Sequence, residues 1–145
     1  MNDNSSLHTT ATELRLATFR LARRLRSVRA LDSMSDAQLA VLAALRAHGR
    51  HSVTALADRE RVTAPTMSAV VTGLEEQGFV IRIPDDEDRR RVQVEITARG
   101  VEIVDDTVER RTQLLMTEIT ELGLSDDQLR TLLEASTLMR KLAEL

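Results

Sequence analysis

Apolar residues recur with helical spacing over most of the chain. The first stripe, with leucine or valine at intervals of three, four and seven residues, predicts a helix over about residues 10–30. Its members are Leu14, Leu21, Leu25 and Val28. A second stripe predicts a helix that ends near Gly49, and Ser35 and Gln38 before it have the spacing of a capping box. This second stripe comprises Leu39, Leu42 and Leu45.

Two further helices are predicted close together in the middle of the chain. A short extended piece leads into the first, which begins at Thr54 and carries apolar residues as far as Val62. Thr63 has the side chain of an N-cap for the second, and Pro65 falls in its first turn, where a missing N–H costs nothing. This helix has an apolar inner face and ends at Gly78. The inner-face residues are Met67, Val70, Val71 and Leu74.

The hydrophobic period then changes from helical to alternating. The runs FVIRIP (79–84) and VQVEIT (92–97) predict two short strands on either side of a polar tip. The apolar face of the second strand comprises Val92, Val94 and Ile96. Thr97 is placed to cap a long helix, which Gly123 interrupts, and a second capping box at 125–128 begins the final helix.

This order of elements predicts a mainly α (α+β) fold. Two helices joined by a tight turn and followed by a β-hairpin form a winged helix-turn-helix. The length of 145 residues suits a single domain, residues 1–145. Within it we expect a winged lobe at 35–99, flanked by long terminal helices at 7–34 and 100–145. The apolar stripes of these terminal helices are too extensive for a thin bundle to cover, which predicts a two-fold dimer.

Composition excludes several classes of protein. Apolar residues make up 42% of the chain, yet it has only two Phe and no Trp or Tyr, so the core must be aliphatic. The absence of Cys excludes disulfides and zinc–thiolate sites. No apolar run approaches the ~20 residues of a membrane span, and the polar start MNDNSSLHTT lacks the apolar segment of a secretory signal. We therefore expect a cytoplasmic protein without a membrane partner.

Candidate catalytic and metal-binding groups are scarce. The sequence has no evident Ser/His/Asp arrangement, Gly-rich phosphate loop or paired carboxylates, so we expect no enzyme activity and no cofactor. His48 and His51 lie near the end of the second helix without an acid at ligand spacing, which predicts no metal site. The acidic run at 85–88 lacks the Gly and the terminal Glu of a calcium loop.

The charge of the chain is unevenly distributed. The net charge of −3 combines +2 over residues 1–45, zero over 46–99 and −5 over 100–145. Nineteen of the twenty basic residues are Arg, which suits bidentate contacts to phosphates and bases, although codon bias would produce the same excess. The distribution therefore leaves nucleic-acid binding open despite the acidic total.

Three consecutive arginines, Arg89, Arg90 and Arg91, lie at the tip of the predicted hairpin. They cannot all be buried, and such a run is useful against the dense negative charge of DNA. A hairpin beside a helix-turn-helix can enter the minor groove, where Arg is favoured. Asp88 could bond one arginine and fix its direction. The alternative is a solvated turn whose charges neutralise one another.

The sequence LADRERVTAPTMSAVVTGLEEQGFVIRIPDDEDRRRVQVEITARG, residues 56–100, resembles the DNA-binding core of the MarR (multiple antibiotic resistance regulator) family. The family's wing signature, Asp-x-Arg followed by Val-x-Val-x-Leu/Ile-Thr, is matched at Asp88, Arg90, Val92, Val94, Ile96 and Thr97. Its Leu-Glu-x-x-Gly pattern at the end of the recognition helix is matched at Leu74, Glu75 and Gly78. The flanking helices also fit in number and length.

The resemblance implies a homodimer made by the first and last helices, with a recognition helix in the major groove of a palindromic operator and a wing in the minor groove. It makes Arg90 the wing arginine and Asp88 its partner. It also implies transcriptional repression relieved by small ligands, which bind where the dimerisation helices meet the winged lobe. An anionic aromatic ligand there would require an arginine, and the nearest candidates are Arg15, Arg20 and Arg46.

The recognition helix departs from the family pattern. Relatives often carry basic residues at the positions of Ala64, Ala69 and Gly73, whereas this chain has none between Arg61 and Arg82. Base recognition would then depend on hydroxyl and small apolar side chains next to the cap. The candidate DNA-binding residues in and before this helix are Thr63, Pro65, Thr66, Ser68, Ala69 and Thr72, with His51 as a possible phosphate contact or a solvated loop residue.

A second function remains open at this point. The missing arginines and the acidic total charge favour a helical protein–protein adaptor whose winged domain does not bind DNA. The wing signature and the hydroxyl-rich helix favour the repressor. Gly73 costs roughly 1 kcal/mol of helix stability relative to Ala, and the sequence alone does not explain it.

Overall fold

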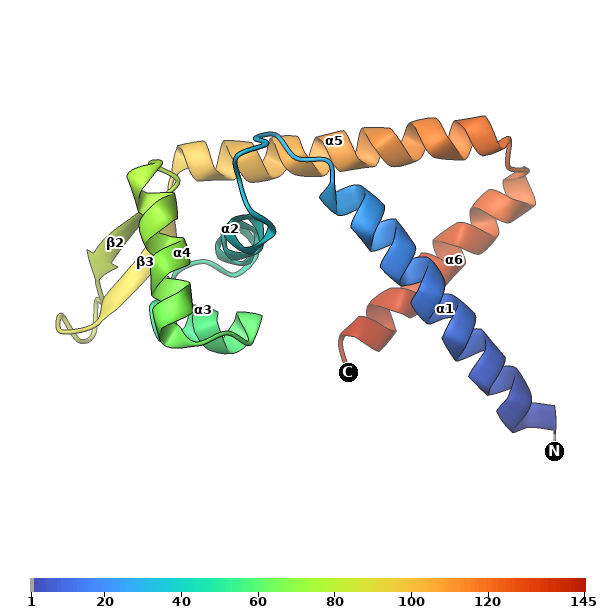
Figure 1. Cartoon of the computed structure of the whole chain (residues 1–145), viewed down its shortest axis with the longest axis horizontal. Helices are drawn as coiled ribbons and strands as arrows, with labels where there is room; N and C mark the ends of the chain where they lie inside the picture. Colours follow the sequence, from blue (N-terminus) through green and yellow to red (C-terminus); the bar gives the residue numbers. More distant parts are fainter. Residues whose placement is uncertain (1) are drawn as a thin grey trace. The chain divides into compact units, whose positions relative to one another are not determined.

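The computed structural model describes residues 2–145, with side chains from Asn4 onward, and confirms the predicted winged helix-turn-helix (Figure 1). A three-stranded antiparallel sheet of order β1-β3-β2 accompanies the helices. The elements are α1 (Asn2–Arg26), α2 (Asp36–His48), β1 (His51–Ser52), α3 (Val53–Glu60), α4 (Ala64–Glu76), β2 (Val80–Pro84), β3 (Val92–Ile96), α5 (Ala98–Leu122) and α6 (Asp126–Ala143). No helix among the described residues is both long and apolar enough to cross a membrane.

The predicted caps of α2, α5 and α6 agree with the structure because they depend on local chemistry. Both capping boxes are complete, with Ser35 and Gln38 at the start of α2 and Ser125 and Gln128 at the start of α6. Thr97 caps α5, since its hydroxyl accepts a bond from the backbone N–H three residues later at 3.1 Å. Each cap satisfies backbone donors that a helix start would otherwise leave without partners.

The first helix differs from its prediction at both ends. It spans Asn2–Arg26 rather than about residues 10–30, because no glycine or proline interrupts the polar start. It ends before Val28 because the following backbone bonds to α5 instead. The Val28 carbonyl accepts from Arg111 Nε at 3.0 Å, and Ala30 N–H donates to the Thr107 hydroxyl at 3.1 Å. These tertiary bonds replace the helical ones.

The third helix also differs from its prediction. It begins at Val53 rather than Thr54, because the Ser52 hydroxyl accepts from Ala55 N–H and caps it. Arg61 then adopts a left-handed conformation with φ of 55°, which ends the helix. Val62 therefore lies outside the helix and is exposed rather than packed.

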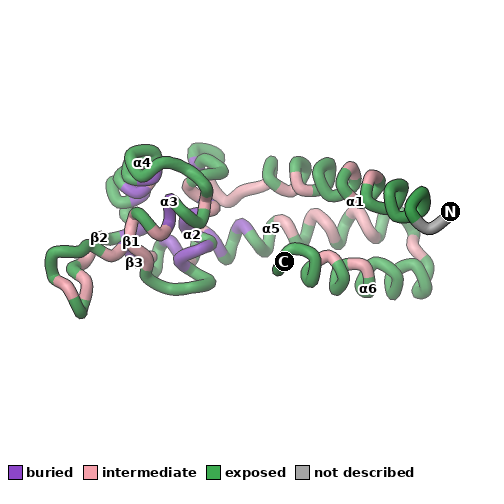
Figure 2. Tube along the Cα trace, turned by 90° about the horizontal axis from the view of Figure 1, so that it is seen from below, coloured by how far each residue is buried: buried purple, intermediate pink, exposed green. Residues whose placement is uncertain are grey.

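The core lies in the winged lobe, as the buried segments in Figure 2 show. It is aliphatic apart from Phe79, the largest buried side chain. The buried residues of α4 are Met67, Val71 and Leu74, three of the four that the helical period predicted, and Val70 packs at their edge. On β3, Val94 is fully buried, but Val92 is 45% exposed because it pairs with Pro84 at the loop end of the hairpin, away from the core.

The chain divides into two compact units, Met1–Arg111 and Thr112–Leu145, with the boundary inside α5. The first unit holds the winged lobe and α1. The second holds the remainder of α5 and all of α6, and no residue of α6 is buried. The apolar side chains of α6 remain largely exposed. The exposed large ones include Leu129, Leu132, Leu133, Leu138 and Leu142.

Candidate nucleic-acid interface

Helix α4 presents a polar face to solvent because its apolar face is held in the core. Thr63 caps the helix, and its hydroxyl contacts both the N–H of Thr66 at 3.3 Å and the hydroxyl of Thr66 at 2.8 Å. Pro65 lies in the first turn, as predicted. All six predicted contact residues of this segment are exposed. They are Thr63, Pro65, Thr66, Ser68, Ala69 and Thr72.

The structure brings an arginine to this face from a different element. Arg82 of β2 donates to a carboxylate oxygen of Glu75 and, at 3.2 Å, to the hydroxyl of Thr72, both on α4. Its position is set by the hairpin, where it pairs with the buried Val94 and so shares the face of the sheet that packs on α4. No pattern in the sequence predicts this contact, because it forms only when β2 packs back against α4.

The wing turn is built by Asp85. Its Oδ1 accepts the backbone N–H groups of Glu87 at 2.9 Å and Asp88 at 3.0 Å, and its Oδ2 accepts from Gln93 Nε2 at 2.5 Å. These hydrogen bonds lower the pKa of Asp85, the bond from the Asp88 backbone being the largest cause. Bonds to an ionised carboxylate hold the turn in one conformation. In the sequence, Asp85 stands out only as the first residue of the acidic run at 85–88, which does not predict its role in the turn.

The arginine run projects from that turn. The side chains of Arg90 and Arg91 are 94% and 77% exposed, and Arg89 is exposed as well. Asp88 lies between Arg90 and Arg91. Its carboxylate oxygens are 3.5 Å from Arg90 Nε and 3.8 Å from Arg91 Nε. The same carboxylate accepts the Arg90 backbone N–H at 3.1 Å. Asp88 therefore contacts two arginines rather than the single one expected from the sequence.

Arg50 connects the base of the wing to the helical lobe. Its guanidinium forms an ion pair with Glu95 on β3 and a longer one, at 3.4 Å, with Asp86 in the wing. His51 follows, and its Nδ1 donates to the Gly49 carbonyl at 2.8 Å. That bond leaves Nε2 of His51 available for an outside partner, so the residue stays a candidate phosphate contact. Arg50 carried no signal in the sequence beyond its charge.

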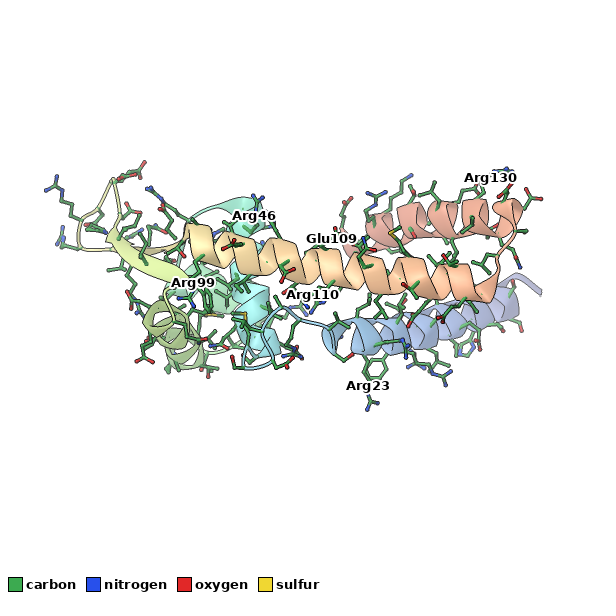
Figure 3. The ribbon with its side chains drawn as sticks, turned by 90° about the horizontal axis from the view of Figure 1, so that it is seen from above. Arg23, Arg46, Arg99, Glu109, Arg110 and Arg130 are labelled. Atoms are coloured by element: carbon green, nitrogen blue, oxygen red, sulfur yellow. The ribbon has the colours of Figure 1, made fainter. Side chains whose placement is uncertain are left out.

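The candidate effector arginines occupy two elements of the first unit. Arg15 and Arg20 are exposed on α1, and Arg46 lies in the last turn of α2 beside α5 (Figure 3). Arg46 forms an ion pair with Asp105 of α5 at 3.3 Å. Its charge is thus already matched, although both side chains are about half exposed and the pair is open to water.

A group of arginines holds the segment between α1 and α2. Arg29 donates to the Met34 carbonyl at 2.5 Å and pairs with Asp36 at 2.9 Å, while Arg111 of α5 bonds the Val28 carbonyl. Partial burial lowers the pKa of Arg111, and the charge of Arg29 lowers it further. These bonds use backbone acceptors that would otherwise lack partners. Within residues 2–145, no three potential ligand side chains gather in a way that could hold a metal ion.

The exposed polar face of α4 beside an arginine-tipped antiparallel hairpin defines a winged helix-turn-helix protein. A model of the MarR family matches residues 34–92. The chain is also 35% identical, over 134 residues, to an uncharacterised HTH-type transcriptional regulator of Mycobacterium leprae, with 92% of each protein covered. The chain belongs to the MarR family, as the resemblance predicted, and is a transcriptional regulator with a DNA-binding fold.

Solved structures agree on the architecture. A MarR family protein from Bacillus stearothermophilus superposes with a TM-score of 0.82 at 18% identity and covers 99% of both chains, which establishes the shared fold. Bordetella bronchiseptica BpsR superposes with a TM-score of 0.62 at 25% identity over 93% of both chains. The structure of BpsR concerns the regulation of its DNA binding by 6-hydroxynicotinic acid.

Proposed function

We propose that this protein is a homodimeric repressor that binds a palindromic operator and is released by a small anionic effector. In this proposal α4 enters the major groove and the wing enters the adjacent minor groove. The observation that carries it is the almost fully exposed Arg90, held by a carboxylate at the tip of a hairpin beside α4. An arginine whose backbone is held by a neighbouring carboxylate and whose guanidinium is exposed is suited to a narrow groove of negative potential.

Two further features support the contact with DNA. The outer face of α4 offers hydroxyls to base edges and phosphates, and Ala69 offers a methyl group to thymine. Asp85 orders the wing backbone in the free protein, so less conformational entropy is lost when DNA binds. Affinity would then depend more on the wing than in relatives with arginines in the recognition helix.

The wing arginines test this proposal. Arg90→Ala should weaken operator binding by about 1–3 kcal/mol, because it removes a contact in the minor groove. Arg89→Ala and Arg91→Ala should weaken binding to DNA of any sequence by about the same factor. Each should also flatten the slope of log K against log salt by about one unit. Asp88→Ala should reproduce part of the Arg90 loss, because an unanchored arginine must be ordered on binding. The measurement is operator affinity at several salt concentrations.

Arg130→Ala is the control, because Arg130 is an exposed, ion-paired arginine of α6 outside the winged lobe. It should leave both affinity and salt slope unchanged. Thermal melts should also hardly change in the wing variants, since an exposed ion pair contributes about 0–1 kcal/mol. If all the wing variants bind like the wild type with the same slope, the arginine run is only a solvated turn, and the adaptor function becomes the better explanation.

The dimer is supported by exposed apolar surface on the terminal helices. Phe19 is 62% exposed and Leu21 43% exposed on α1, and Leu133 is 69% exposed on α6. Large apolar side chains that stay exposed on each of these helices are typical of an interaction site in a protein that folds in water. A two-fold dimer would also place two α4 helices on successive major grooves, as a palindromic operator requires.

The effector site is proposed at Arg15, Arg20 and Arg46. BpsR is regulated by an aromatic acid, and a carboxylate of that kind could compete with Asp105 for Arg46. We expect salicylate or 6-hydroxynicotinate to bind with a measurable heat and to lower operator affinity. Arg46→Ala should lose that heat, whereas Arg130→Ala should retain it. Equal heats in the wild type and in all three arginine-to-alanine variants would remove the site from consideration.

A further inference from the structure

The hydroxyl of Thr72 on α4 is bonded to another element and not to its own helix backbone. Five other helical threonines donate their hydroxyl hydrogen to the carbonyl four residues earlier, at 2.8–3.1 Å. These five are Thr9, Thr117, Thr120, Thr131 and Thr137. The Thr72 hydroxyl instead accepts a bond from Arg82 Nη2 at 3.2 Å. Thr72 lies on the exposed face of α4, and its own hydrogen has no acceptor among the side chains and backbone of residues 4–145.

Arg82 is well placed to hold that hydroxyl. Its side chain is only 26% exposed, and one arm of the guanidinium is fixed by the Glu75 carboxylate while the other reaches Thr72. Thr72 and Glu75 are three residues apart and therefore neighbours on the surface of α4. The planar guanidinium can bond both at once in a single geometry, which a flexible ammonium would not fix.

We propose that Arg82 is a positioning residue that makes Thr72 a hydrogen-bond donor to one base of the operator. This inference rests on the proposed function. The bond from Arg82 occupies only a lone pair of Thr72 Oγ1, so the hydroxyl can still donate its hydrogen to an outside acceptor. In the major groove the acceptors are purine N7, guanine O6 and thymine O4, whereas the amino groups of adenine and cytosine only donate. Thr72 therefore selects for an acceptor at its position.

Glu75 determines that Arg82 does not act as a phosphate contact. The carboxylate neutralises the guanidinium, and the pair leaves little net charge on this part of α4. Loss of Arg82 should then alter base preference without altering the dependence of affinity on salt. Loss of a wing arginine should do the reverse, so the two roles are separable in one set of measurements.

The test compares Thr72→Val, Arg82→Met, Arg82→Lys and the double variant on operators in which single purines are replaced by 7-deazapurines. In the wild type, one replacement should weaken binding roughly 2- to 10-fold, the loss expected for one neutral hydrogen bond. That penalty should vanish in Thr72→Val and in Arg82→Met, and Arg82→Lys should restore part of it. The double variant should bind no worse than Thr72→Val, because the two residues act through one hydroxyl.

The same operators should be scanned with thymine O4 and guanine O6 analogues, since any of the three acceptors satisfies the proposal. Arg99→Met is the matched control, because Arg99 also reaches the end of α4, where it donates to the Gln77 carbonyl at 3.1 Å and stacks on Phe79. It should keep every base preference of the wild type. A salt slope flattened by about one unit in Arg82→Met would mean that Arg82 itself contacts phosphate, and would overturn the proposal.

A measurement without DNA separates this proposal from the proposed function. Three-bond couplings to the Thr72 methyl group should show a single χ1 rotamer in the free wild type and an average over rotamers in Arg82→Met. Averaging in the wild type overturns the positioning role even if DNA binds tightly. A wild type that binds no DNA but holds one rotamer would refute the repressor and the donor role together, while the Arg82–Thr72 contact itself would stand. If Arg82→Met does not fold, Thr72→Val and the wild-type couplings still decide.

Discussion

Substituting aspartate for Leu21 on α1 and Leu133 on α6 should convert the protein to a monomer and abolish operator binding. Both side chains are substantially exposed in the single chain, at 43% and 69%, so the change removes little packing within it. In a dimer interface each aspartate would be buried without a partner, which costs several kcal/mol. A monomer would also lose the avidity of two linked half-sites, which we expect to weaken operator binding by about 100-fold or more.

Light scattering should report half the mass of the wild type, and circular dichroism should show that the helices persist. Thr131→Asp is the control, since residues two apart do not share a helix face, so it introduces the same charge on α6 away from Leu133 and beside Asp127 and Glu134. It should remain a dimer with wild-type affinity. A double variant that keeps the dimer mass would show that the exposed leucines serve another purpose.

Gly100→Ala should destabilise the protein by about 2–4 kcal/mol, the upper part of the range for overpacking, and lower the melting temperature by roughly 5–15 °C. A Cβ at this position would lie 2.3 Å from the Phe79 carbonyl oxygen and 2.7 Å from Ile96 Cγ1. The carbonyl is fixed because it accepts the Thr97 N–H at 3.0 Å at the base of the hairpin. The clash therefore has to displace backbone, not a side-chain end. The loss should exceed the ~1 kcal/mol that Ala gains over Gly in a helix.

Gly73→Ala is the matched control, since it makes the same substitution inside α4. There the new Cβ would meet only the Nε2 end of Gln38, at 3.2 Å. The amide must shift by a few tenths of an ångström, which offsets part of the ~1 kcal/mol helix gain, so stability should stay within about 1 kcal/mol of the wild type. Thermal melts of both variants test the pair. Equal destabilisation at the two glycines would contradict this account of both positions.

The close contact of Gln38 also accounts for Gly73, which the sequence left unexplained. Gln38 closes the capping box of α2, accepting the Ser35 N–H at 3.0 Å through Oε1, so its side chain cannot move freely. A glycine at position 73 of α4 avoids a close contact between a Cβ atom and the side-chain amide of Gln38. The contact comes from α2, 35 positions earlier in the chain, and no pattern within α4 could have shown it.

The helices, the strands and the exposed face of α4 could be predicted from residues that lie close together in the chain. Caps at Ser35, Thr63 and Ser125, the helical stripes and the alternating strand all act within a few residues, so their chemistry is visible in order along the chain. The exposed arginines at 89–91 were predictable for the same reason, since three like charges at a turn must face water.

Contacts between separate elements could be known only from the folded chain. They include the hydrogen bond from Arg82 to Thr72 and the ion pairs of Arg50 with Glu95 and Asp86. They also include the close approach of the Phe79 carbonyl to Gly100. Hydrogen bonds and contact distances of this kind depend on the register of β2 against β3 and on the packing of that hairpin against α4. A periodic pattern fixes which face of an element is buried, but it does not fix which side chain of another element meets it, because that requires three-dimensional coordinates for both.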